Sequence, residues 1–412
     1  MAKPNASKVV GGAWHIVRRL AVLAPLACGA NADAAETSIQ ALRESDLLVD
    51  FRLRYENVDQ AGIAEAADAL TGRLRLGVQT APLRKTSLLG EAVWIEALRD
   101  GYNDTLNGAT QYPVVADPDD LVAINRFALV NESLPGTKLT VGRQRIVHDD
   151  ARFVGNVGWR QHEQTFDALR AEIDAAAKLD LTYAAQINRV FGPDSPQGKW
   201  EGDVVLASMS IPTPAGALSV FDHYLDIDEM PAASTNTAGL RLSGSRPLGR
   251  LQASYALGIA RQSDVANNPA DIAETWSLIE GGLSFGKLGV WAGIETLGGD
   301  GTVAFTTPLA TLHAFQGWAD KFLATPPDGI EDRYLRLSYA LPKDGPFTAV
   351  SLLGLYHDYA ADASSAEYGD ELNLQLVART PRLVLTLKYA TYRAAALLTD
   401  TDKLWMSLDV AF

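Results

Sequence analysis

The chain is poor in cysteine and lacks long apolar runs. Its 412 residues include one cysteine, Cys28, and after the first thirty or so residues no apolar run approaches the roughly 18 residues that a membrane-spanning helix requires. With no thiol beyond Cys28, disulfides and thiolate metal sites are excluded from the rest of the chain. These absences argue against a disulfide-stapled fold and against a bundle of membrane helices.

The amino-terminal segment has the three parts of a secretory signal. Four basic residues precede the apolar stretch 20–27, and Ala30-Asn31-Ala32 supplies a small-residue cleavage pattern. Pro25 argues against both alternatives, an amphipathic soluble helix and a lipoprotein signal ending at Cys28. We therefore expect residues 1–32 to be a signal peptide and residues 33–412 to form the exported protein.

The exported chain is expected to be strongly acidic. Removing Lys3, Lys8, Arg18 and Arg19 leaves 32 basic residues against 50 acidic ones, a net charge of −18. Nucleic acid is therefore not expected as a partner, because its phosphates would be repelled.

The carboxy-terminal segment alternates apolar and other residues at every second position. Leu404, Met406, Leu408, Val410 and Phe412 lie on one side of an extended chain. A tilted strand needs roughly 9–11 residues to cross the hydrocarbon layer, and alternation lets one face meet lipid while the other faces a polar lumen. The pattern is typical of a strand of an outer-membrane β-barrel that ends on an aromatic residue.

The same period of two recurs along the whole mature chain. Clear alternation occupies residues 49–56, 73–78, 179–188, 237–243, 251–262, 288–295, 371–376 and 383–389. Less regular strands are expected at 86–98, 121–132, 137–146, 164–172, 203–211, 217–226, 274–284, 333–340 and 348–358. Together with the last segment these make about eighteen strands, while helical spacing of apolar residues is scarce.

Connector lengths support a barrel over a soluble β-fold. Short connectors such as 81–85, 134–136, 212–216 and 342–346 alternate with long polar ones at 100–120, 147–163, 191–202, 264–273 and 298–332. Outer-membrane barrels have tight turns at one end and long loops at the other. A β-sandwich or propeller is the alternative, but no repeat of 40–50 residues is present. We predict an all-β, antiparallel transmembrane barrel of about eighteen strands, in one domain.

Basic residues on the polar face form the main candidate site. The predicted pore-lining residues are Arg52, Arg54, Arg73, Arg75, Arg241, Arg336 and Lys388. The first four should make a two-by-two cluster, because residues two apart on a strand face the same way. Guanidinium groups orient carboxylates, and basic rings favour anions in a pore. Alternatively, these groups brace the wall by pairing with Asp50, Glu56, Glu295, Glu371 and Asp409.

The sequence offers little for catalysis or metal binding. The six histidines are scattered, and neither a G-x-S-x-G nor an H-E-x-x-H pattern occurs. His148 beside Asp149 and Asp150 is more simply a polar loop than an acid–base site. We expect no enzyme activity, no cofactor and no metal, with calcium between acidic loops as an alternative.

Three blocks resemble proteins of the alginate export family, in its broad branch. They are GYNDTLNGATQYPV at 101–114, VGRQRIVHDDARFVGNVGWRQHEQTFDA at 141–168 and FTTPLATLHAFQGWADKFL at 305–323. The resemblance covers roughly residues 45–412. It implies a monomeric 18-stranded outer-membrane barrel whose basic lumen handles a polyuronate.

These observations predict a passive channel of the Gram-negative outer membrane. The expected solutes are anionic saccharides or organic acids, including a polyuronate such as alginate, and the expected surroundings are outer-membrane lipid and lipopolysaccharide. Block 305–323 is expected to fold into or over the pore, as a gate or as a rigid cap. A general porin without saccharide preference and a plugged, surface-structural barrel are the alternatives.

Overall fold

The computed structural model describes residues 40–412 except 116, 343 and 344. The expected signal peptide, residues 1–32, lies outside this part, so the boundary at residue 33 stays a prediction. The strands are β1 (Asp46–Gln60), β2 (Ala67–Gln79), β3 (Thr86–Gly101), β4 (Asp120–Asn131), β5 (Thr137–Gln144), β6 (Thr165–Asp174), β7 (Lys178–Asn188), β8 (Lys199–Thr213), β9 (Gly216–Ile227), β10 (Thr235–Leu248), β11 (Leu251–Asp264), β12 (Ala273–Phe285), β13 (Leu288–Leu297), β14 (Ile330–Ala340), β15 (Ala349–Ala360), β16 (Glu367–Arg379), β17 (Leu383–Ala394) and β18 (Thr401–Ala411).

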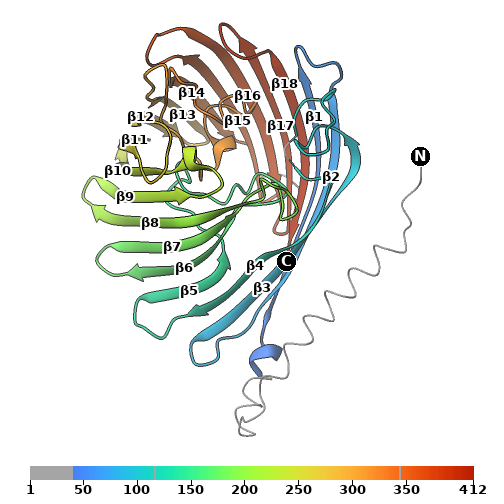
Figure 1. Cartoon of the computed structure of the whole chain (residues 1–412), viewed down its shortest axis with the longest axis vertical. Helices are drawn as coiled ribbons and strands as arrows, with labels where there is room; N and C mark the ends of the chain where they lie inside the picture. Colours follow the sequence, from blue (N-terminus) through green and yellow to red (C-terminus); the bar gives the residue numbers. More distant parts are fainter. Residues whose placement is uncertain (1–39, 116, 343–344) are drawn as a thin grey trace.

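The strands form one closed antiparallel barrel. Each strand pairs with its neighbours in sequence, and β1 pairs with both β2 and β18, so the 18-stranded sheet has no free edge (Figure 1). Closure satisfies the backbone hydrogen bonds of every strand inside the sheet, which a lipid environment requires. The predicted fold class and strand number are confirmed.

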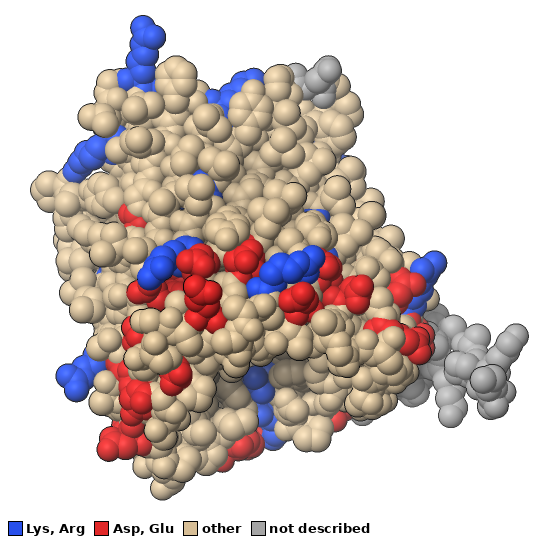
Figure 2. Space-filling view, turned by 90° about the horizontal axis from the view of Figure 1, so that it is seen from above, with Lys and Arg blue, Asp and Glu red and all other residues tan. Residues whose placement is uncertain are grey.

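The period of two separates an apolar outside from a polar inside. On β2, the side chains of Arg73 and Arg75 are buried in the barrel, whereas the next residue, Leu76, is exposed on the outer wall. Ile279 on β12 is 65% exposed on that wall. Figure 2 shows a broad outer face with few charged residues, bordered by a belt of acidic and basic side chains. Such a face is suited to contact lipid.

The two ends of the barrel differ in connector length. Two-residue turns at 214–215, 249–250 and 286–287 lie at one end, and loops 102–119, 145–164 and 298–329 at the other. The predicted connectors 191–202 and 212–216 are shorter than expected. Lys199 already pairs with Asn188, and β8 and β9 continue their ladder to Thr213 and Gly216.

Loops 145–164 and 298–329 fold into the barrel and fill much of it. They join each other through a parallel bridge between Val154 and Leu309. Phe153 packs against Phe221 and Trp276 of the wall and against Phe305 of the second loop. Block 305–323 therefore lies inside the barrel, as expected.

Helix is nearly absent from the described residues. Residues 40–43 form a helical turn before β1, and two short 3-10 turns occur at Pro231–Ala233 and Leu312–Ala314. In the described part of the chain, no helix is long and apolar enough to cross a membrane.

Candidate functional site

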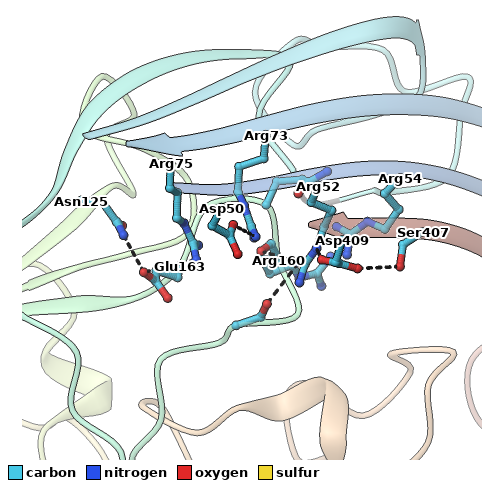
Figure 3. Close-up of polar contacts among 12 residues, drawn as sticks. Asp50, Arg52, Arg54, Arg73, Arg75, Asn125, Arg160, Glu163, Ser407 and Asp409 are labelled. Carbon is cyan, nitrogen blue, oxygen red and sulfur yellow. Dashed lines mark hydrogen bonds and ion pairs between the residues drawn. The ribbon is translucent and has the colours of Figure 1, made fainter. Parts of the chain in front are cut away.

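The four arginines of β1 and β2 lie on the inner wall, but as a staggered group. Arg52 stands opposite Arg73 across the strand pair, while Arg75 stands opposite Asp50 and Arg54 opposite Thr71. The expected two-by-two cluster is therefore wrong in detail. The register shifts the arginines of β2 by two residues relative to those of β1, so only Arg52 and Arg73 stand opposite each other. Arg52 pairs with Asp409 and Arg73 with Asp50, both on the wall itself (Figure 3).

Arg54 and Arg75 instead pair with carboxylates that the long loops supply. Arg54 forms an ion pair with Asp117, both side chains being 1% exposed, and Arg75 lies 3.6 Å from Glu163. Burial alone would raise the pKa of Glu163, but the guanidinium groups of Arg75 and Arg145 lower that pKa to about 2. This side of the wall thus carries cations that are neutralised by the loops covering it.

The same arginines also donate to the backbone of loop 145–164. The Nη1 group of Arg54 donates to the carbonyl oxygen of Trp159, and that of Arg52 donates to the same oxygen over 3.1 Å. The guanidinium of Arg54 also lies over the indole ring of Trp159. Hydrogen bonds to charged donors are about twice as strong as neutral ones. The cluster therefore anchors this loop to β1.

Lys388 of β17 lies in a box of tryptophans beneath both loops. Its Nζ is 3.7 Å from the ring centroid of Trp318 and 4.2 Å from that of Trp159, and 2.6 Å from Nε2 of His313. The other ring nitrogen of His313 contacts Asp320, 2.7 Å away. Lys388 is 4% exposed, so it holds the loops and has little surface for a solute.

Asp320 of loop 298–329 contacts basic groups of both loops and of the wall. Its carboxylate lies 3.2 Å from Nζ of Lys403 on β18 and 3.7 Å from the guanidinium of Arg160. Burial alone would raise the pKa of Asp320, but His313, Lys403 and Arg160 hold that pKa well below its usual range. An ionised carboxylate here ties both loops to the barrel.

Arg241 and Arg336 have a different environment, on the opposite side of the lumen. Arg241 of β10 lies 3.2 Å from carboxylate oxygens of both Asp149 and Asp150 in loop 145–164. Arg336 of β14 stacks on Trp291, and its contact with a carboxylate, that of Glu280, is 3.9 Å long. Both guanidinium groups border open space inside the barrel.

That space includes two cavities and, between them, a small pocket that we call the neck. The first, of about 670 Å³, opens near the tight turns of β4–β8 and is lined by Lys85, Lys138 and Lys178 together with five carboxylates. The second, of about 330 Å³, lies among β10 and β12–β15 and includes Arg241, Arg336 and His357. A neck of about 10 Å³ shares His148 and Asp149 with the first and Asp150 and Arg241 with the second.

The proposed carboxylate partners are only partly those expected from sequence. Asp50 and Asp409 pair with wall arginines as anticipated, whereas Glu295 pairs with Arg152 of loop 145–164. Glu371 accepts a hydrogen bond from the backbone amide of Ala319 in the second loop. Glu56 is buried, and no ion pair of its carboxylate is found among the described residues.

Several charged groups at the site were not predicted, because they lie in loops without periodicity. They are Asp117, Arg152, Arg160, Glu163 and Asp320. His223, which lies on strand β9, was not predicted either. His223 contacts His148, with 3.2 Å between their ring nitrogens. The blocks 141–168 and 305–323 contain most of these groups, so the resemblance was the signal that pointed to them. Within the described residues, no three histidine, cysteine or acidic side chains gather as a metal site would require.

Comparison with known proteins agrees with this geometry. Residues 95–190 match the model described as alginate export. The OpdK structure with vanillate, from Pseudomonas aeruginosa, aligns with a TM-score of 0.68 at 13% identity, over 89% of this chain and 98% of that one. OccAB2 of Acinetobacter baumannii gives 0.70 at 15% identity, over 89% and 98%. OpdL of Pseudomonas aeruginosa gives 0.66 at 18% identity, over 90% and 99%.

The comparison with curated proteins finds no match. The structural likeness shows the fold, and the family match covers the segment from the end of β3 to loop 189–198. With its closed barrel, apolar outer face and long inward-folded loops, the chain has the β-barrel fold of outer-membrane porins. Its resemblance to the alginate export family is confirmed over residues 95–190.

Proposed function

We propose that the chain is an outer-membrane channel for small anionic solutes, which pass through the lumen between the two cavities. The observation that carries this proposal is the position of Arg241 and Arg336, two cations of the inner wall that border open space. Arginine binds carboxylates through a planar fork of donors, and basic groups in a pore favour anions.

Arg336 is the most accessible of these candidate contacts. Its side chain is 34% exposed, and its 3.9 Å contact with Glu280 leaves much of the guanidinium charge uncompensated. Leu278 and Leu355 line the same cavity and would contact the apolar part of a solute. Small-molecule sites have volumes of about 300–1,000 Å³, so a cavity of about 330 Å³ suits one sugar acid or a small organic acid. Vanillate in the OpdK structure, the anion of an organic acid, supports this size and charge.

The other predicted pore residues enter the proposal through the loops. Arg52, Arg54, Arg75 and Lys388 hold the long loops against the wall, and a solute would touch them only after those loops move. Arg73 pairs with Asp50 on the wall itself. A neck of about 10 Å³ holds about one water molecule, so passage of any of these solutes requires a movement at the neck. A polyuronate such as alginate requires the larger movement, and a monomeric or short uronate is therefore the favoured saccharide.

The dense bonding of the loops favours a second candidate, a plugged barrel with a structural role. Arg54 and Lys403 of the wall pair with buried loop carboxylates, and Arg152 of loop 145–164 pairs with Glu295 of the wall. Buried pairs of this kind are costly to break. A general diffusion porin would share the fold but show no preference at Arg241 or Arg336.

Planar-bilayer recording separates these functions. For an anion channel we expect discrete conductance steps, a reversal potential that favours anions, and block by glucuronate or short oligouronates but not by neutral sugars. Replacing Arg241 and Arg336 by glutamine should reduce the anion preference. A plugged barrel gives no steps, and a general porin gives weak selectivity that the double substitution leaves unchanged.

A further inference from the structure

The turn His148–Phe153 separates the two cavities. It lies at the tip of loop 145–164, where His148 contacts His223, Arg152 pairs with Glu295, and Phe153 packs on Phe221 and Trp276. Between these anchors, Asp149 and Asp150 face the neck. The turn therefore positions two carboxylates at the narrowest point of the enclosed space.

Both carboxylates engage the same guanidinium. Asp149 Oδ1 and Oδ2 lie 3.2 Å from Nη1 of Arg241, and Asp150 Oδ2 lies 3.2 Å from Nη2. The Nε of Arg241 is buried, and it has no hydrogen-bond partner among the described residues. The guanidinium is thus held by two acids where a single bidentate carboxylate would satisfy most of its donors.

We infer that Asp149 and Asp150 occupy Arg241 as internal substitutes for an anionic solute, so that Arg241 selects solutes able to displace them. This inference rests on the proposed function and names the residue that determines its specificity. A solute carboxylate reaching the neck from either cavity meets Arg241 there and exchanges with the aspartates. Neutral solutes have no group that compensates the lost ion pairs and are held back.

The contact is suited to exchange because it is the least buried of the ion pairs between loop and wall. The side chains are 16% exposed for Arg241, 31% for Asp149 and 34% for Asp150, against 1% for both partners of Arg54–Asp117. A partly exposed pair is weaker than a fully buried one, so a competing carboxylate at moderate concentration can replace it.

The backbone of the turn is also strained. Asp149 and Ala151 have φ values of 50° and 66°, in the left-handed region. Aspartate tolerates this region, but alanine adopts it only at an energetic cost. Burial also raises the pKa of Asp150, which shows that its charged form is not fully compensated here. Loss of the ion pairs between the two aspartates and Arg241 therefore allows this strained turn to relax.

The test is calorimetric binding of glucuronate to the full chain in detergent, which needs no conduction. Asp149→Asn with Asp150→Asn should tighten binding about two- to fivefold, because about 0.4–1 kcal/mol of competition is removed. Arg241→Gln should abolish most binding. Once Arg241 is replaced, adding the two aspartate substitutions should have no further effect. Unchanged or weaker binding in the aspartate variant overturns the inference.

Asp174→Asn is the matched control, because it removes a carboxylate from the lining of the first cavity without touching Arg241. We expect it to leave affinity nearly unchanged, and a gain equal to that of the double aspartate variant would overturn the inference in favour of a general charge effect. The heat-modifiable gel shift confirms folding of each variant. If binding follows the predicted order while wild-type protein gives no conductance steps, the inference stands and the proposed channel function fails.

Discussion

The two sides of the lumen use the same residue type for different purposes. On β1 and β2, arginines are covered by loops whose buried carboxylates neutralise them, as with Arg54 and Asp117. On β10 and β14, Arg241 and Arg336 border cavities and have partly exposed or distant partners. The alternating pattern of a strand therefore determines whether a side chain faces the lumen or the lipid. The loops determine whether a side chain in the lumen contacts solute or protein.

The largest expected effect is on the covered side. Arg54→Gln leaves the Asp117 carboxylate buried without its guanidinium, which we expect to destabilise the barrel by about 3–5 kcal/mol. Urea unfolding of the protein in lipid vesicles measures this change. Arg333→Gln is the control, because the Arg333 side chain is 57% exposed, and it should change stability by less than about 0.5 kcal/mol. Equal effects of the two substitutions would contradict the role of Arg54 in holding the loops to the wall.

The next largest effect is expected at acid pH, which should weaken the docking of loop 145–164 on the β1–β2 side of the wall. The folded-state pKa of Glu163 is about 2, below the ordinary value of 4.5, so its ionised form stabilises the docked loop above about pH 4.5. That contribution, of the order of 3 kcal/mol, is lost progressively as the pH falls from about 4.5 toward 2. Hydrogen exchange in loop 145–164 should rise in this range.

The matched variant for the acid effect is Glu163→Gln. Its loop should exchange faster at neutral pH and should show a smaller rise below pH 4.5, because the titrating carboxylate is gone. An acid response that is as large in this variant as in the wild type would assign the release to another group.

A smaller effect is expected on the open side. Arg336→Gln removes a partly exposed cation whose carboxylate contact is long, so the stability should hardly change. The anion-to-cation permeability ratio should fall about two- to fivefold, the equivalent of about 0.4–1 kcal/mol. Reversal potentials in a salt gradient give this ratio. A large loss of stability with unchanged selectivity would indicate that Arg336, like the arginines of β1 and β2, stabilises the barrel and does not contact solute.

Much of the barrel follows from the sequence, and the site does so only in part. Residues two apart on a pleated strand must share a face, so the period of two placed Arg52, Arg73 and Arg241 on the inner wall. Asp117 and Glu163 lie in aperiodic loops, and no local pattern tells which arginine they meet across the lumen. The register between β1 and β2 could not be predicted either, because alternation determines which face a residue lies on but not which residue stands opposite it.

The most direct test of the account compares the ion selectivity of two double variants in planar bilayers. We expect Arg241→Gln with Arg336→Gln to lower the anion preference at unchanged stability. We expect Arg52→Gln with Arg73→Gln to alter stability and loop docking more than selectivity. The reverse result, with selectivity lost only in the β1–β2 variant, would contradict the account and place the solute path along the covered wall.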